Sequence, residues 1–171
     1  PASVTTIGEW AFDDCSLEYV AIDNLSHWCN ITFADDQANP LFYAKDMYVD
    51  GEAITDITIP EDVTKINRYA FRGWKSLQSV TIPDHVTTID MYAFSVCDNL
   101  RSITIGSGVT TIGKRAFYGC TGELRINSNI PSAADYDQGP FYTAKFTKIT
   151  IGDNVTTIGD HAFVGCVATY A

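Results

Sequence analysis

Apolar and polar residues alternate along the chain in a pattern that returns at a fixed interval. In the segment 79–82, Ser-Val-Thr-Ile, every second residue is apolar, which predicts a strand with one buried face. Pro83 has no N–H group and ends this strand, so the chain turns there. The next apolar residues have a helical spacing, which predicts a short turn of helix opposite the strand. They are Ile89, Ala93, Phe94 and Cys97.

The unit of strand, turn and helical turn is repeated every 23 residues. This interval separates Phe71, Phe94 and Phe117, and also Val63, Val86 and Val109. Self-similarity with a period of about 20–29 residues is the signature of leucine-rich repeats. One unit cannot bury its own apolar side, so neighbouring units stack and their strands form a parallel sheet with a spacing of about 4.8 Å. We therefore predict an α/β-type repeat fold, a right-handed leucine-rich-repeat solenoid of about seven coils.

The whole chain, residues 1–171, is expected to form a single solenoid domain in which two coils are irregular. In the first of these, at about residues 23–59, Val20 and Ile57 are 37 residues apart, which is one period plus an insertion of 14 residues. The insertion contains Asp50-Gly51 between two short apolar segments. This pair accepts the positive φ angles of a type I′ turn, so the insertion is predicted to contain a β-hairpin.

The second irregular coil, at about residues 128–148, is expected to keep the interval of 23 residues but to change its core. The interval is set by Ile103, Ile126 and Ile149. Ser132 and Asp135 occupy the positions of the usual Val and Ile. The expected replacements in the core are Ile130, Phe141 and Phe146.

The chain begins and ends inside a repeat, with Pro1 at the position that Pro60 and Pro83 occupy in later units. Solenoids need polar caps at both ends, so we expect this sequence to be a piece of a longer array. No apolar run reaches the roughly 18 residues of a membrane span, and no secretion signal is recognisable. A signal and an anchor are expected outside this fragment.

One unit in the middle of the chain shows the repeat most completely. It runs Leu77-Gln78-Ser79-Val80-Thr81-Ile82-Pro83, then Val86-Thr87-Thr88-Ile89, Ala93-Phe94, Cys97 and Leu100. This unit resembles the BspA-type leucine-rich repeat, L-x-x-I-x-I-P-x-x-V-T-x-I-G-x-x-A-F-x-x-C-x-x-L. The chain departs from that pattern at Trp74, in a Cys position, and at Asn67 and Asp90, in Gly positions. The resemblance implies a surface-exposed or secreted protein of host-associated bacteria. Some members of the family are adhesins that bind extracellular-matrix proteins of the host.

The composition is acidic, with 21 acidic and 11 basic residues and a net charge of −10. Nucleic acids and anionic membrane surfaces are therefore disfavoured as partners, because phosphate binding requires clustered Lys and Arg. The three histidines, His27, His85 and His161, lie in different units and form no metal-binding pair. Asp135 and Asp137 could contact calcium but belong to no complete ligand loop. We predict no catalytic residues, no metal site and no cofactor, and hence a non-enzymatic protein.

Solenoids commonly bind partners through the concave face of their sheet, because its curvature brings many side chains onto one surface. The alternation places two columns of outward side chains there. The first column is Tyr19, Asp56, Ser79, Ser102, Arg125 and Lys148, and the second is Ala21, Thr58, Thr81, Thr104, Asn127 and Thr150. We predict that a host matrix protein or a protein of a neighbouring cell binds to these columns. The alternative is a solvated threonine ladder that only suits strand propensity.

The residue before each Ala-Phe pair forms a further column of candidates. These residues are Trp10, Tyr69, Tyr92, Arg115 and His161. Aromatic side chains there could hold sugar rings, but we expect them to lie flat on their neighbours and cover the edge of the core. The Asp50-Gly51 hairpin and the loop 132–139 stand out from the repeats and are weaker candidates. A glycan-binding module and a structural spacer of a surface protein are the alternatives to a protein-binding module.

Four of the five cysteines, Cys15, Cys97, Cys120 and Cys166, occupy the same position of the repeat. Coils about 4.8 Å apart would allow a disulfide between Cys97 and Cys120. The position faces the core, however, and a buried free cysteine behaves as a small apolar residue. We expect reduced thiols in the core.

Overall fold

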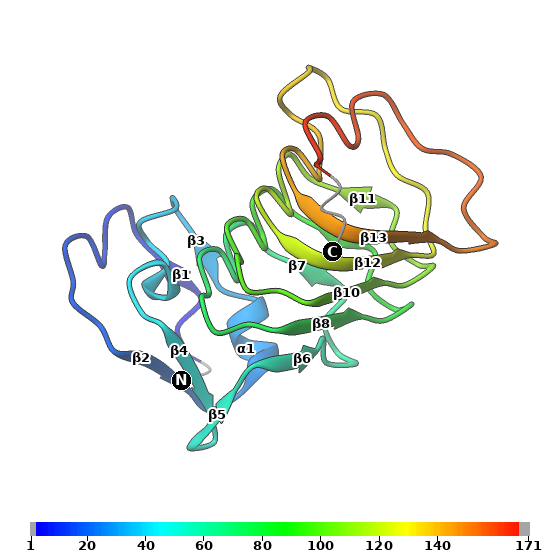
Figure 1. The fold of residues 1–171 in the computed structure, drawn as a ribbon. Helices are drawn as coiled ribbons and strands as arrows, with labels where there is room; N and C mark the ends of the chain where they lie inside the picture. The colour runs from blue at the N-terminus through cyan, green and yellow to red at the C-terminus, as the bar shows by residue number, and fades with distance from the viewer. Residues whose placement is uncertain (1–2, 168–171) are drawn as a thin grey trace.

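Figure 1 shows the computed structural model, which describes residues 3–167. The alternating segments form strands with the predicted faces, as in β8 (Ser79–Ile82), where Val80 and Ile82 are buried and Thr81 is exposed. Successive coils of this pattern stack into a solenoid. The assignment of Pro1 to the proline position of the repeat lies outside the described residues.

The main sheet is parallel throughout and has the strand order β13-β12-β10-β8-β6. Its strands are β6 (Asp56–Thr58), β8 (Ser79–Ile82), β10 (Ser102–Ile105), β12 (Thr121–Ile126) and β13 (Lys145–Ile151). Each strand comes from a different coil, so this sheet confirms the predicted leucine-rich-repeat solenoid (Figure 1).

The predicted hairpin is present and divides the sheet of the solenoid in two. A separate sheet contains β2 (Tyr19–Ile22), β4 (Asp46–Val49) and β5 (Glu52–Ile54). β4 is parallel to β2 but antiparallel to β5, and the turn between β4 and β5 has positive φ at Asp50 (49°) and Gly51 (85°). β5 leads directly into β6, which pairs only with β8. The parallel ladder is therefore interrupted at the insertion, where the sequence alone suggested continuous columns.

The first irregular coil also contains two short helices that the sequence analysis did not predict. They are α1 (Leu25–Cys29) and the 3-10 helix η1 (Pro40–Phe42). The side chain of Asn24 caps α1 by accepting hydrogen bonds from the backbone N–H groups of Ser26 and His27. Trp28 is buried and donates its indole N–H to the carbonyl oxygen of Ala70 at 2.7 Å, which holds α1 against the next coil.

A second row of very short parallel strands follows the turn after the main strand. It consists of β1 (Thr6–Ile7), β3 (Thr32–Phe33), β7 (Lys65–Ile66), β9 (Thr88–Ile89) and β11 (Thr111–Ile112). β1 pairs with β3, and β7, β9 and β11 form a separate three-stranded sheet.

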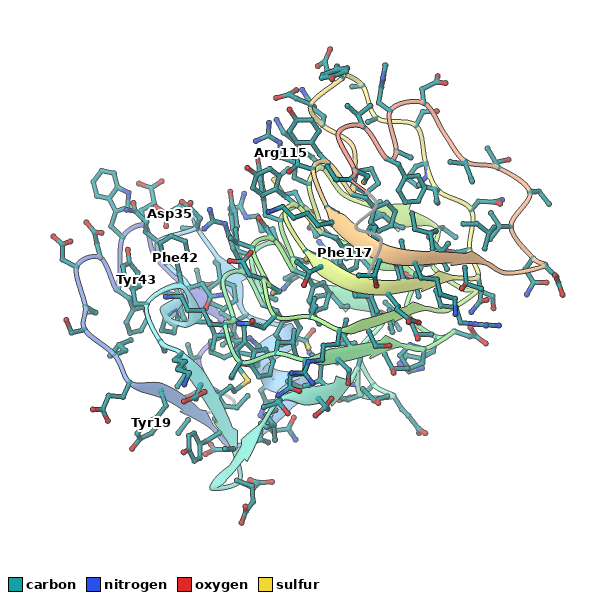
Figure 2. The ribbon with its side chains drawn as sticks, viewed as in Figure 1. Tyr19, Asp35, Phe42, Tyr43, Arg115 and Phe117 are labelled. Carbon is teal, nitrogen blue, oxygen red and sulfur yellow. The ribbon has the colours of Figure 1, made fainter. Side chains whose placement is uncertain are left out.

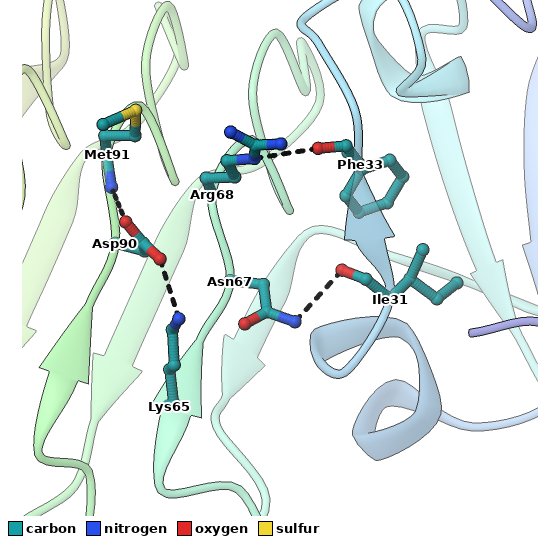
Figure 3. A network of polar contacts seen from close by, with 7 residues as sticks. All are labelled: Ile31, Phe33, Lys65, Asn67, Arg68, Asp90 and Met91. Carbon is teal, nitrogen blue, oxygen red and sulfur yellow. Dashed lines mark hydrogen bonds and ion pairs between the residues drawn. The ribbon is translucent and has the colours of Figure 1, made fainter. Parts of the chain in front are cut away.

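Side chains close the gap between the two parts of this second row. The Nδ2 atom of Asn67 donates to the carbonyl oxygen of Ile31 at 3.2 Å, and Nε of Arg68 donates to that of Phe33 at 3.0 Å (Figure 3). In the neighbouring coil Asp90 accepts from the N–H of Met91 and pairs with Lys65 (Figure 3). Asn67 and Asp90, the two departures from the family glycine, thus each make specific polar contacts.

The helical turn predicted opposite each strand is wrong, because the chain forms irregular turns there. The residue before each Ala-Phe pair has a left-handed backbone, with φ between 52° and 63°. These residues are Trp10, Tyr69, Tyr92, Arg115 and His161. The N–H of Tyr92 then donates to the oxygen of Lys114 at 3.0 Å, and that of Phe94 to the oxygen of Ala116 at 2.8 Å. Both acceptors belong to the next coil, whereas the N–H groups of Ala93 and Ser95 donate within their own coil. Alternate N–H groups that a helix would use therefore join neighbouring coils instead.

The pairing of β12 corrects the register expected from the interval of 23 residues. Leu124, not Ile126, lies beside Ile103, and Ile126 lies beside Ile105. The reason is that β12 begins at Thr121, directly after the Cys position, so this coil is two residues shorter than the coil before it. The following coil is longer, with Leu124 beside Ile149.

A continuous core runs through the coils, and its centre is a row of phenylalanine rings. Neighbouring centroids are 5.1 Å apart for Phe71–Phe94, 5.2 Å for Phe94–Phe117, 5.4 Å for Phe117–Phe141 and 4.9 Å for Phe141–Phe163. All four pairs are stacked. The predicted core replacements Ile130, Phe141 and Phe146 are buried, as is Trp74 in its Cys position.

We predict that Phe94→Ala lowers the free energy of unfolding by about 3–5 kcal/mol, because the fully buried ring stacks on both sides and its loss leaves a cavity. Urea denaturation measures this change. Tyr136→Ala removes an aromatic ring that is 65% exposed and serves as the control, with an expected change within about 0.5 kcal/mol. Equal effects of the two substitutions would contradict the buried phenylalanine row.

Candidate binding surfaces

The outward side chains of the main sheet form two columns, which we call the strand face. The corrected first column is Asp56, Ser79, Ser102, Glu123 and Lys148, and the second is Thr58, Thr81, Thr104, Arg125 and Thr150. Most of the residues predicted for the binding face therefore lie together on one sheet.

Two predicted residues change their place, and one residue joins the strand face that the sequence analysis did not include. Arg125 lies beside Thr104, in the second column, and Glu123 takes its predicted place beside Ser102. Asn127 follows the end of β12 and does not belong to either column. Glu123 was missed because aligning identical isoleucines hid the short coil. The charged end of the strand face therefore contains the acidic Glu123 together with the basic Arg125 and Lys148.

Tyr19 does not belong to the strand face. It lies on β2 (Figure 2), in the separate sheet that also contains the hairpin strands β4 and β5. Its ring centroid is 4.9 Å from that of Tyr48. The ring is 53% exposed. The insertion places it apart from Asp56, which the sequence had assigned as its neighbour in the column.

Charged groups on the strand face have few strong partners. Asp56 accepts hydrogen bonds from the hydroxyls of Ser79 and Thr55, and these two bonds lower the pKa of its carboxyl group. Lys148 and Glu123 are 3.8 Å apart, but both side chains are more than half exposed. Such an exposed pair contributes little to stability, so both charges stay accessible to a partner.

A polar cavity of about 340 Å³ lies at the starts of strands from both sheets, and we call it the junction pocket. Lys45 and Asp46 line it from the start of β4. Gln78 and Arg101 line it from the residues that precede β8 and β10. Sequence reasoning missed this site, because the repeat pattern does not show that the hairpin separates the sheets.

The first described coil has an apolar cavity of about 290 Å³. Val4, Ile7, Phe12, Leu17 and Val20 line it with side chains that correspond to core positions in later coils. These side chains are partly or largely exposed here, since no coil precedes them in the described chain.

The residues before the Ala-Phe pairs do not all cover the core edge with aromatic rings. Tyr69 and Tyr92 stack with centroids 5.5 Å apart and are half-buried, as expected for side chains that cover the core edge. Arg115 (labelled in Figure 2) pairs with Asp137 at 2.6 Å. Its guanidinium group lies over the rings of Tyr118 and Tyr142. Trp10, by contrast, is 64% exposed.

The loop 132–139 uses its carboxylates internally. Asp137 is held by Arg115, and Asp135 accepts a hydrogen bond from the side chain of Gln138 at 2.7 Å. Within residues 3–167, no group of three or more His, Cys, Asp or Glu side chains is arranged to hold a metal ion.

All five cysteines are free thiols, as predicted. Cys97 and Cys120 are buried, and each Sγ donates a hydrogen bond to the oxygen of a phenylalanine in the preceding coil, at 3.1 and 3.0 Å. Burial is the main cause that raises the pKa of Cys120, and it raises that of Cys166 to about 11. Cys15, however, is exposed, so the expectation of a core thiol is wrong for the first coil.

We predict that iodoacetamide modifies Cys15 first in the folded protein at mildly alkaline pH. Cys97 and Cys120 are expected to stay unmodified until the protein unfolds, because burial blocks access and the raised pKa of Cys120 disfavours its reactive thiolate. Peptide mass spectrometry measures the extent of labelling. Unfolding without reductant should expose five reactive thiols, and a chain two hydrogens lighter, with Cys97 joined to Cys120, would overturn this assignment.

The stacked coils and the parallel sheet define a leucine-rich-repeat solenoid. The family model for the BspA type leucine rich repeat region matches the chain in six copies, over residues 1–39 and 44–169. The protein therefore belongs to the family of BspA-type leucine-rich-repeat proteins, and the six copies are close to the expected number of about seven coils. No curated protein and no solved structure shows a significant match to the chain.

Membership of this family indicates a typical location and a typical role. Proteins of this family are typically found on bacterial cell surfaces, and leucine-rich-repeat solenoids are typically non-catalytic scaffolds for binding. No helix among the described residues is both long and apolar enough for a membrane span.

Proposed function

We propose that this domain is a non-enzymatic binding module of a cell-surface or secreted protein, and that it engages a host matrix protein or a protein of a neighbouring cell through the strand face. The family supports a binding scaffold at the cell surface. The choice of face rests on the threonines of the strand face, which lie in register on one sheet and have hydroxyls that are unpaired within the described residues.

Some threonines outside the strand face make side-chain hydrogen bonds that hold coils together. The hydroxyl of Thr87 donates to the oxygen of Thr64, and that of Thr110 donates to the oxygen of Thr87. On the strand face, the described structure gives the hydroxyls of Thr81 and Thr104 no such partner. These hydroxyls are free to bind another molecule, which is the observation that carries the proposal.

A structural spacer is the competing function, and the same observation argues against it. A spacer needs only a soluble surface, for which any polar side chain would serve. The strand face instead presents short hydroxyl side chains in register on a rigid sheet, with Asp56 at one end and Lys148 at the other. Short side chains let a partner approach the sheet closely and lose little conformational entropy on binding.

The test is a biosensor screen of the domain against a panel of purified extracellular-matrix proteins and mucins. At least one is expected to bind, and the double substitution Thr81→Arg/Thr104→Arg should weaken that binding by about tenfold or more, equivalent to about 1.4 kcal/mol. Two long charged side chains at the centre of the face would prevent close approach. Both sites are outward positions of the sheet, so the variant is expected to fold normally.

The matched control is Thr64→Arg/Ser107→Arg, which adds the same charge at exposed sites away from the strand face. It should leave binding within about twofold of the original protein. Failure of every panel protein to bind, or equal loss with both double variants, would refute binding through the strand face.

A further inference from the structure

The junction pocket is a consequence of the hairpin insertion. Lys45 precedes β4, and its carbonyl oxygen accepts a hydrogen bond from the N–H of Ser76 at 3.2 Å. The carbonyl oxygen of Thr55, between β5 and β6, accepts a hydrogen bond from the N–H of Gln78 at 2.6 Å. The residues before β4 and before β6 are thus both hydrogen-bonded to the residues before β8, although β4 and β6 belong to different sheets. A regular repeat would pair its strands at this edge and close the space.

Three basic side chains line the junction pocket, although the protein is acidic. They are Lys45, Lys75 and Arg101, in a chain with a net charge of −10. Elsewhere in the described chain, several cations are neutralised by close carboxylates, as in Lys65–Asp90 at 2.8 Å and Arg72–Asp36 at 3.1 Å.

No ion pair within 4.0 Å is found for the three pocket cations in residues 3–167. Arg101 interacts electrostatically with Asp56, and Lys75 with Asp98, but neither carboxylate is within ion-pair distance. The three cations therefore form no close ion pair that an anionic ligand would have to displace.

The other lining groups offer both hydrogen-bond donors and acceptors. Ser76 accepts from the indole N–H of Trp74 at 2.9 Å, which leaves its O–H free to donate. Asn99 donates to the oxygen of Lys75 at 2.7 Å, which leaves its side-chain oxygen free to accept. Asp46 adds a carboxylate that needs a donor from the ligand.

We propose that the junction pocket binds a carboxylate-bearing sugar unit, such as a uronic acid at the end of a glycan. The cations pair with the sugar carboxylate, while Asp46 and the amide oxygens accept from its hydroxyls. The volume of about 340 Å³ is at the lower end for small-molecule sites, which suits one sugar ring rather than a peptide segment. A glutamate side chain of an acidic peptide would satisfy the cations but has no hydroxyl groups to donate to Asp46.

The experiment is a titration of the domain, followed by NMR, with three small probes at low ionic strength. Methyl glucuronide carries both features, methyl glucoside has the hydroxyls without the carboxylate, and glutarate has carboxylates without the ring. We expect methyl glucuronide to bind with a Kd near about 1 mM and the other two at least about tenfold more weakly. Equal binding of glutarate, or of a short poly-glutamate peptide, would overturn the sugar assignment, as would no binding of methyl glucuronide.

Two substitutions test the location. Arg101→Gln should weaken methyl glucuronide at least about tenfold, because it removes a cation that can hold a carboxylate at two points. Asp46→Asn should reduce the preference for methyl glucuronide over glutarate, since the acceptor for sugar hydroxyls is altered.

The control is Lys114→Gln, which makes the same change of charge outside the pocket. It should leave binding of methyl glucuronide within about twofold, and a loss equal to that of Arg101→Gln would mean only general electrostatic attraction. The pocket lies beside the strand face but shares no residue with it, so Thr81→Arg/Thr104→Arg should not weaken the binding of methyl glucuronide. Failure of the sugar to bind would therefore not affect the proposed protein-binding function.

Discussion

The fold depends on hydrogen bonds between coils, because no coil satisfies its own backbone or buries its own apolar side. Ser79 pairs with Ser102 in the main sheet, Thr88 pairs with Thr111 in the second row, and Phe94 bonds to Ala116 at the turns. Each coil is thus held on several sides by its neighbour, and the phenylalanine rings are stacked as a result. This arrangement also explains the left-handed residues, whose cost of about 1–2 kcal/mol each is offset by bonds to the next coil.

Candidate functions arise at two kinds of place in this framework. Where the repeat is regular, the strands pair in register, so Ser and Thr residues from successive coils line up on the strand face. Where the repeat is interrupted, the hairpin at Asp50-Gly51 parts the sheets and produces the junction pocket with its cations. The regular coils therefore offer a broad surface that suits a protein, while the insertion offers a small polar cavity that suits a single charged group.

The sequence predicted features that depend on local chemistry and on the repeat. The period gave the stacking of Phe71, Phe94 and Phe117, and Asp50-Gly51 gave the hairpin. Prediction from the sequence failed where the local structure depends on contacts with the neighbouring coil. Helical spacing at the turns was misleading, because alternate N–H groups there find acceptors in the next coil. The place of Arg125 was misjudged, because identical residues were aligned across a coil that is two residues short. The junction pocket depends on how two sheets diverge, which no pattern in one coil reveals.

The most direct test of this account is a set of inter-strand nuclear Overhauser effects on isotope-labelled protein. The account predicts cross-peaks between the backbone protons of Thr104 and both Thr81 and Arg125, together with contacts of the Phe94 ring to Phe71 and Phe117. Cross-peaks from Thr104 to Asn127 instead of Arg125, or a Phe94 ring without aromatic neighbours, would contradict the stacking in register on which the strand face depends.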